Sequence, residues 1–378
     1  MRERVPVVNP KMVTLAREAR GLTQSELATR LQITQGVLSK IENGLVQAPV
    51  EVLEKLQSEL DFPKEFFYQP DSIHGVGTDN FHQLYRRRKA LPMKAMRRIE
   101  ARVNIVRMHT GRMLRAVNIE PGHGIPKLDL DDFDGDVERI AATLRASWLL
   151  PNGPVENVVK CIEDAGGMVL PFDFATQQVD ATSLRYGDMP PLMYYNQNLL
   201  GDRQRFTLAH ELGHMVMHSV VPNADMEDQA DRFAAEFLMP AREIASQLNN
   251  LNLQRAAQLK RYWRVSMGAI IMRAKTLGKL TSNQSQYLWM QMGAAGLRTR
   301  EPPELDVPVE QPRLQQELID LHLKGLGYSI DELCSTLAST PRDFAELYGG
   351  SIPASQLRNL TSTERYGSAN VVGLHLRK

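Results

Sequence analysis

The chain has 378 residues, which is more than one ordinary hydrophobic core accommodates and predicts two or three domains. Its formal net charge of +1 at pH 7 gives no overall field typical of nucleic-acid or membrane proteins, so such a partner would have to be recognised by local charge. The two cysteines, Cys161 and Cys334, lie far apart, and no apolar run suits a signal peptide or the ~20-residue span of a membrane. We therefore expect a soluble cytoplasmic protein without a disulfide scaffold.

Helical periodicity fills the first seventy residues. The run Thr23-Gln24-Ser25-Glu26 is a capping-box signature that opens a helix ending near Leu31, and a further helix is predicted over 35–43, ended by Gly44. Over about 10–68 the chain resembles the Xre/Cro-type helix-turn-helix family. The residues of that resemblance are Leu15, Ala19, Arg20, Leu22, Thr23, Gln24, Glu26, Leu27 and Ala28, then Gln35, Leu38, Ser39, Lys40, Ile41, Glu42, Asn43 and Gly44.

This resemblance implies a DNA operator as a partner, with residues 35–40 opening the recognition helix in the major groove. Gln35 and Ser39 can bond base edges, whereas Gln24, at a helix N-terminus, and Lys40 suit phosphates. Gly36 leaves one position of that helix bare. The alternative is a helix-turn-helix kept only for dimerisation or docking, and a homodimer would be consistent with either.

A basic segment follows a predicted linker at 71–80. From 92 to 117 it has helical periodicity, with Met96, Ile99, Val103, Val106 and Leu114 as the apolar stripe. Its basic residues are Arg86, Arg87, Arg88, Lys89, Lys94, Arg97, Arg98, Arg102, Arg107, Arg112 and Arg115. They can form a solvated face, bridge to acidic neighbours or contact the DNA backbone.

The middle of the chain changes to a mixed pattern. Short β-like runs at 167–171, 181–185 and 191–196 predict a small sheet, and helices are predicted over 134–147, 154–165, 201–220 and 224–238. The region 241–348 is predicted to be all-helical, and the polar tail after Pro353 to be only partly ordered.

The helix predicted over 201–220 contains His210-Glu211-Leu212-Gly213-His214. Histidines four residues apart leave one face of a helix about one turn apart, which is the spacing that two imidazoles need to bind one Zn²⁺. Glu211, next to the first histidine, can take a proton from a water molecule that the metal activates, and Gly213 leaves room beneath the histidines. The alternative is a helix whose histidines only form hydrogen bonds.

A catalytic zinc site needs a third protein ligand. His218 lies about 12 Å along the helix from His210, so we expect it to line the pocket or act behind the ligands. Glu227 and Asp231 share a face of the next helix, which should fold back antiparallel after a turn at Pro222-Asn223. One carboxylate can bind zinc while the other orients a histidine, and spacing alone leaves both assignments open.

The run from Arg205 to His214, followed by Glu227, Ala230, Asp231, Phe233, Ala234, Ala235, Phe237, Leu238, Met239 and Pro240, resembles the ImmA/IrrE family of metallopeptidases over roughly 140–280. The resemblance implies Glu227 as third ligand and places Asp231 behind a histidine. The strand ending Met193-Tyr194-Tyr195-Asn196 looks like the edge strand along which a peptide substrate would pair. Family activity implies limited proteolysis of a repressor-type transcription factor, in stress response or mobile-element transfer.

A second helix-turn-helix rhythm occupies 259–278, with its turn at Val265-Ser266. We expect it to pack as a helical subdomain and not to bind DNA. Met267, Met272, Met290 and Met292 are then core or adaptable contact surface.

The predicted fold is mainly α and multidomain: an all-α helix-turn-helix, a central α+β zincin-like peptidase domain with a small sheet, and an all-α C-terminal region. The expected boundaries are 1–70, 71–133, 134–250, 251–350 and 351–378. The leading hypothesis is a DNA-binding regulator with a zinc endopeptidase that cuts a repressor-type protein or itself. The alternative is a repressor or antitoxin whose peptidase-like domain is a non-catalytic sensor or docking module. A purely structural zinc site would need a fourth ligand, and none is evident.

Overall fold

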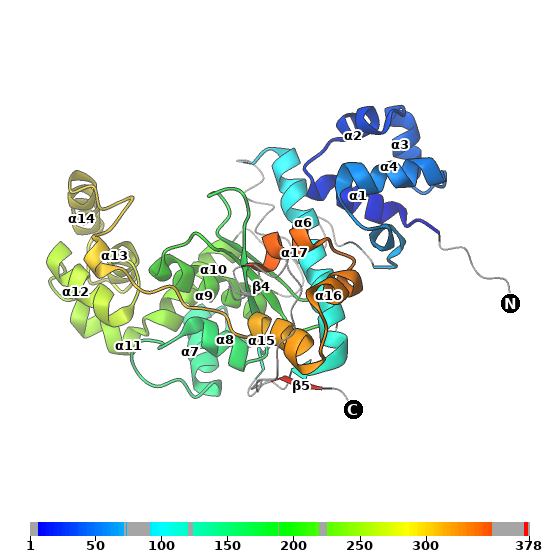
Figure 1. Cartoon of the computed structure of the whole chain (residues 1–378). Helices are drawn as coiled ribbons and strands as arrows, with labels where there is room; N and C mark the ends of the chain where they lie inside the picture. Colours follow the sequence, from blue (N-terminus) through cyan, green and yellow to red (C-terminus); the bar gives the residue numbers. More distant parts are fainter. Residues whose placement is uncertain are drawn as a thin grey trace. The chain divides into compact units, whose positions relative to one another are not determined.

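The computed structural model describes residues 7–71, 73, 91–119, 124–187, 189–218, 225–349 and 374–376. Most of the predicted linker, the basic run 86–89, the turn at 222–223 and nearly all of the tail lie outside these ranges. The chain divides into two compact units, Met1–Glu120 with Leu314–Lys378 (unit 1) and Pro121–Arg313 (unit 2). Figure 1 gives the order of their elements. Every helix in the described ranges is too short or too polar to span a bilayer.

The N-terminal part of unit 1 is a helix-turn-helix fold. Its helices are α1 (Pro10–Ala19), α2 (Gln24–Leu31), α3 (Gln35–Glu42) and α4 (Val50–Leu60), followed by the 3₁₀ turn η1 (Lys64–Tyr68). The predicted capping box at Thr23 is present, and Gly44 follows α3 with φ +72°, a left-handed conformation that favours glycine. Leu27, Leu31, Leu38 and Ile41 are fully buried, so the helices enclose a small apolar core.

The basic segment forms α6 (Met93–Met113), which packs against α1. The predicted apolar stripe is buried, and a second set of its residues, Ala101, Ile105 and Met108, joins the core of the helix-turn-helix fold. Four of its basic side chains pair with acids: Lys94 with Glu26 (2.8 Å), Arg97 with Glu18 (3.8 Å), Arg102 with Glu346 (2.8 Å) and Arg112 with Asp71 (2.6 Å). For these four, bridging to acidic neighbours is the arrangement observed.

The C-terminal helices return to unit 1. They are α15 (Leu314–Asp320), the π turn η6 (Leu321–Gly325), α16 (Ile330–Leu337) and α17 (Pro341–Tyr348). α16 contacts α6, and Ala338 belongs to the same core as the helix-turn-helix fold. The helix predicted to reach residue 117 ends earlier, because η2 (Leu114–Ala116) leads into strand β1 (Val117–Ile119), which pairs antiparallel with β5 (Leu374–Leu376).

Unit 2 contains the predicted small sheet. Helices α7 (Val137–Ser147) and α8 (Val158–Asp164) precede strands β2 (Met168–Phe172), β3 (Ala181–Leu184) and β4 (Leu192–Asn196). The order is β2-β4-β3, with β2 and β4 parallel and β3 and β4 antiparallel. The prediction that β4 is an edge strand is therefore wrong. All five of its residues are buried, as expected of a strand with neighbours on both sides and cover on both faces.

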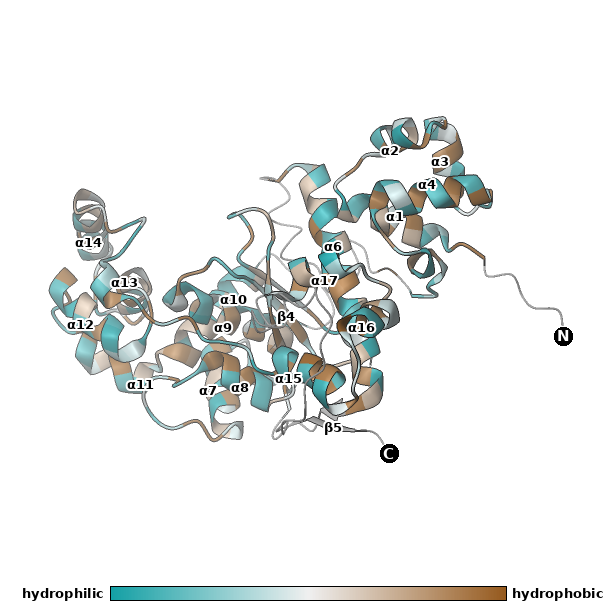
Figure 2. Ribbon diagram, in the orientation of Figure 1, coloured by the Kyte–Doolittle hydropathy of each residue, from teal (hydrophilic) through white to brown (hydrophobic). Residues whose placement is uncertain are grey.

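Helices α9 (Gly201–Met217) and α10 (Met226–Leu238) follow the sheet and pack against each other. The short α11 (Ala241–Ile244) and η4 (Ala245–Leu248) lead to α12 (Leu253–Trp263), α13 (Met267–Thr276) and α14 (Ser282–Ala294). Trp263, Val265 and Ile270 are fully buried in the core that also holds α9 and α10, so the second helix-turn-helix rhythm packs into unit 2. Figure 2 shows hydrophobic and hydrophilic bands alternating along these helices, as expected when one face is buried.

Met267 and Met292 are buried, whereas Met272 and Met290 are 47% and 59% exposed, so the four methionines divide between the core and the surface, as the sequence predicted. One detail of this region differs from the sequence prediction. The segment 306–313, after the 3₁₀ turn η5 (Pro303–Leu305), is not helical. Prolines at 302, 303, 308 and 312 lack the N–H group that a helix interior needs, and Glu310 is bound to α9 through Gln204 and Arg205.

Candidate metal centre and nucleic-acid interface

The position of α9 is fixed at its N-terminal end. Arg205 is fully buried and donates to the carbonyls of Arg264 (3.0 Å) and Val155 (2.6 Å) while it pairs with Glu310. Gly201 lies against the backbone of Val307, where a Cβ atom would collide with the carbonyl oxygen. These contacts hold rigid the helix that carries the histidines.

The two histidines of α9 present their Nε2 atoms to the same point. These atoms are 3.1 Å apart, and the imidazoles are 14% (His210) and 10% (His214) exposed. The Glu227 carboxylate of α10 lies 3.6 Å from each Nε2 atom. His210, His214 and Glu227 therefore form one group of possible metal ligands.

Gly213 allows α10 to pack closely against α9. A Cβ atom at this position would lie 2.9 Å from Cδ1 of Phe233, which is fully buried on α10. The room predicted beneath the histidines is thus occupied by an aromatic ring of the neighbouring helix. His210 meets Asp231 and His214 meets Glu227, so the two helices run in opposite directions, as the sequence predicted.

The three side chains fit a zinc ion. Around a tetrahedral Zn²⁺ with bonds of about 2.0–2.1 Å, ligand atoms are about 3.3–3.4 Å apart. The observed separations of 3.1 and 3.6 Å lie on either side of that value. Two imidazoles and one carboxylate are also the donor set that zinc shares with many hydrolytic sites, and three protein ligands leave a coordination position open.

The Nδ1 atoms of His210 and His214, which point away from the shared Nε2 position, also have hydrogen-bond partners. Nδ1 of His210 lies 2.7 Å from Asp231 Oδ1. Nδ1 of His214 lies 2.9 Å from Nδ1 of His218, whose Nε2 lies 2.8 Å from Oε1 of Gln229. If Nε2 of His214 binds a metal, its Nδ1–H donates to His218, and Nε2–H of His218 donates to the amide oxygen of Gln229.

Electrostatics distinguish His210 from His218. Burial lowers the pKa of His210, but its hydrogen bonds to Asp231 and Glu227 outweigh that effect and raise the pKa to about 9. Burial lowers the pKa of His218, which lies just after the last residue of α9. A neutral His218 is the form that can accept from one imidazole and donate to Gln229.

Glu211 is 1% exposed and lies close enough to His210 to raise the pKa of that imidazole. Its carboxylate is thus next to the cluster, on the same helix as both histidines. β3 and β4 both pack against α9, and β3 is the edge strand on the antiparallel side of the sheet. Among the described strands of unit 2, none pairs with the outer edge of β3.

The four predicted DNA contacts lie on α2 and α3 of the helix-turn-helix fold. Gln35 donates to Gln24 (2.7 Å), and Gln24 donates to Glu42 (2.8 Å). Ser39 accepts a hydrogen bond from Asn43 through its backbone carbonyl (2.8 Å), and Lys40 is exposed. The structure therefore joins Gln24 and Gln35 directly and leaves Lys40 at the surface.

Sequence reasoning missed several supporting residues. Gln229, which accepts from His218, has no sequence signal beyond its place on the same helix as Glu227. Arg17 is buried and pairs with Glu42 at 2.6 Å, which ties α1 to α3. An arginine on an otherwise apolar helix face was the available signal. Val37 is 41% exposed beside the bare position of Gly36 and adds an apolar side chain to the recognition helix.

Comparison with known families agrees with both motifs. Residues 162–275 match the family model described as the IrrE N-terminal-like domain (Peptidase_M78), and residues 14–67 match a helix-turn-helix model (HTH_3). No curated protein matches the chain. The two resemblances inferred from the motifs are confirmed, and the chain joins a helix-turn-helix DNA-binding domain to an IrrE N-terminal-like domain.

Proposed function

We propose that this chain is a DNA-binding transcription regulator whose IrrE-like domain is a zinc-dependent endopeptidase. The observation that supports catalysis is the convergence of His210, His214 and Glu227, with Glu211 beside them. Within the described residues, the cluster offers three ligands, and a closed structural site would need four. The donor set thus favours a site with an open position for substrate.

Each residue of the site has a distinct role in this proposal. When bound, Zn²⁺ supplies a Lewis acid that polarises the scissile carbonyl and lowers the pKa of a water molecule. Glu211 accepts the proton of the attacking water and delivers it to the leaving amine. Asp231 orients the His210 ring, and His218 with Gln229 orients the His214 ring.

The substrate chain would bind to the sheet. β3 packs against α9 and is an edge strand, so an extended peptide can add to its outer side through main-chain hydrogen bonds. The sequence favoured β4 as the strand that pairs with substrate. Because β4 is the central strand, we propose β3 for this role. We propose a repressor-type transcription factor, or this chain itself, as the protein that is cut.

The helix-turn-helix domain would bring the peptidase to DNA. Gln35 and Ser39 face base edges in this proposal, and Gln24 and Lys40 contact phosphates. The bond between Gln35 and Gln24 orders the first residue of α3 before DNA arrives. Operator recognition and homodimer formation belong to the proposal.

The test compares zinc-loaded parent protein with the Glu211→Gln variant. Both are incubated alone and with purified helix-turn-helix repressors, and fragments are identified by mass spectrometry. Asp228→Asn, at an exposed acid of α10, is the matched control. We expect the parent and the control to cut and Glu211→Gln to bind zinc without cutting. Cleavage that survives Glu211→Gln would refute the mechanism, and zinc binding without cleavage by any form would favour the non-catalytic sensor.

A further inference from the structure

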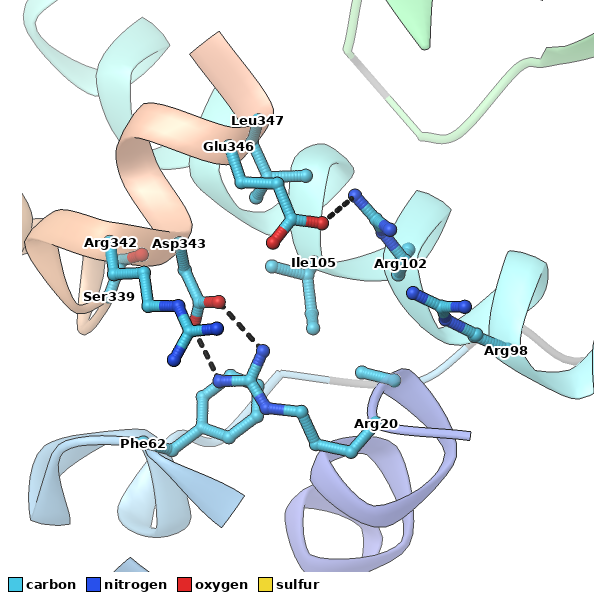
Figure 3. Close-up of a pocket in the computed structure, with 11 residues that line it drawn as sticks. Arg20, Phe62, Arg98, Arg102, Ile105, Ser339, Arg342, Asp343, Glu346 and Leu347 are labelled. Carbon is cyan, nitrogen blue, oxygen red and sulfur yellow. Dashed lines mark hydrogen bonds and ion pairs between the residues drawn. The ribbon is translucent and has the colours of Figure 1, made fainter. Parts of the chain in front are cut away.

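Unit 1 contains a recess of about 200 Å³, and the residues that line it are far in the sequence from the candidate zinc ligands. Its walls come from the C-terminal end of α1, from Phe62 just after α4, from the middle of α6, and from α17. Figure 3 shows charged side chains converging there: Arg20, Arg98, Arg102, Arg342, Asp343 and Glu346. Four guanidinium groups face two carboxylates, so the recess has an excess of positive charge.

Two of the arginines have carboxylate partners. Arg20 donates to both oxygens of Asp343 at 2.7 Å, and it also donates to the carbonyls of Leu60 (2.6 Å) and Asp61 (2.8 Å). Arg102 pairs with Glu346 at 2.8 Å. Both carboxylates of the recess are therefore bound by these two guanidinium groups.

Within the described residues, the other two arginines, Arg98 and Arg342, form no hydrogen-bonded pair with a carboxylate. The Nε atom of Arg98 is buried and has no hydrogen-bond partner within the described residues. Its side chain lies across Gly21, where a Cβ atom would come within 3.3 Å of Cδ, so glycine allows the arginine to lie there. Arg342 is 83% exposed and reaches a carboxylate, that of Asp61, only at 3.9 Å. A buried guanidinium N–H without an acceptor is costly, and an oxyanion would satisfy it.

The rest of the lining is apolar. The ring of Phe62 lies beneath Arg20, with the guanidinium carbon 4.4 Å from the ring centroid, and Ile105 lines the recess from α6. A volume of about 200 Å³ is smaller than the roughly 300–1,000 Å³ of sites for drug-sized ligands. The recess therefore suits a small ligand with one charged end and one apolar end.

We infer that this recess binds a small organic oxyanion, a carboxylate or phosphate monoester with a short apolar body, through Arg98. The guanidinium fork recognises the oxyanion, and Phe62 with Ile105 contacts the body. Because the walls belong both to the helix-turn-helix fold and to α17, the ligand would stabilise their association. The inference is independent of peptidase activity.

Calorimetric titration of the full-length protein tests it, with benzoate and phenyl phosphate as probes at constant ionic strength. Benzyl alcohol is the neutral control and inorganic phosphate the control without an apolar body. We expect saturable binding of one organic anion, none of benzyl alcohol, and weaker binding of inorganic phosphate. The tighter of the two organic anions identifies the charged group.

Variants locate the site. Arg98→Gln should weaken binding at least tenfold, whereas Arg97→Gln, at the neighbouring exposed arginine of α6, should leave it unchanged. Arg98→Lys keeps the positive charge but loses the planar guanidinium group. It takes the place of Arg98→Gln in the titration if the glutamine variant does not fold. No saturable binding of either organic anion, or equal losses in the Arg97 and Arg98 variants, would overturn the inference. Equal affinity for inorganic phosphate and phenyl phosphate would overturn the role of the apolar wall.

Discussion

Replacing Gly213 with alanine tests the helix contact that brings Glu227 to the histidines. The new Cβ atom would lie 2.9 Å from Cδ1, 3.1 Å from Cγ and 3.2 Å from Cβ of Phe233. Carbon atoms in favourable contact are about 3.5–4.0 Å apart, so each of these approaches is too close. Because Phe233 is fully buried, its ring has little space to turn aside, and α10 must move away from α9.

Two effects of the substitution oppose each other. Overpacking a core costs about 1–3 kcal/mol, whereas replacing glycine by alanine within a helix gains about 1 kcal/mol. We expect a net loss of up to about 2 kcal/mol in the stability of unit 2. The effect on zinc should be larger, because metal–ligand distances tolerate only about 0.2 Å and the shift needed is about half an ångström or more. Removing Glu227 from the ion should weaken zinc binding at least tenfold.

Competition with a chromogenic chelator measures the zinc affinity, and thermal unfolding of the metal-free protein measures stability. Gly36→Ala in α3 is the matched control, because nothing lies within 4 Å of the added Cβ atom. We expect this control to gain about 0.5–1 kcal/mol and to bind zinc like the parent. Unchanged zinc affinity in Gly213→Ala would refute the argument that the close approach of Phe233 positions Glu227.

Three further predictions concern separate parts of the chain. Asp231→Asn keeps an acceptor for His210 but loses the charge, so we expect zinc affinity to fall roughly tenfold in the same chelator assay; an unchanged affinity would contradict the role of the carboxylate. Lys40→Gln should weaken binding to random-sequence duplex DNA and reduce the slope of log affinity against log salt by about 1, and an unchanged slope would exclude a phosphate contact. Burial, with a contribution from Arg112, lowers the pKa of His109 from 6.5 to about 3, so the folded state disfavours a proton that the unfolded state accepts. Stability should fall as pH drops from about 6.5 towards 3, by roughly 2 kcal/mol at pH 5, and His109→Gln should remove this loss. Hydrogen exchange of α6 amides, compared at equal pH, measures it, and identical pH profiles in both proteins would contradict it.

Local spacing predicted the elements of the candidate site because helix geometry repeats from protein to protein. The positions of His210 and His214 follow from an i, i+4 interval, and the start of α2 follows from its capping box. Spacing did not choose between Glu227 and Asp231. In the structure, Glu227 meets the Nε2 atoms of both histidines, whereas Asp231 meets the Nδ1 atom of His210. That distinction depends on how two helices cross, which no interval within one helix contains.

The sequence also did not predict which segments, far apart in the chain, pack against each other. The apolar run of β4 showed that the strand is buried, but its neighbours on both sides come from residues at least eight positions earlier in the chain. Likewise, the stripe on α6 predicted a buried face, although Ala101 and Ile105 lie on a second buried face that meets the helix-turn-helix core. Periodicity reports that a face is covered and does not report what covers it.

Unit 1 is built from two segments of the chain, and this bears on the choice between self-cleavage and cleavage of another protein. The chain leaves unit 1 after Glu120 and returns at Leu314. The segments are also joined by side chains: Arg20 holds Asp343, His109 lies 3.0 Å from the Tyr348 hydroxyl, and Arg112 donates to the carbonyl of Leu337 at 2.9 Å. A single cut within 121–313 would leave these contacts intact, so the C-terminal helices would stay on the helix-turn-helix fold. Self-cleavage can therefore free the DNA-binding segment from its C-terminal helices only if those contacts also break, whereas cleavage of a separate repressor has no such requirement. The position of the cut, read from the fragment masses, decides between the two.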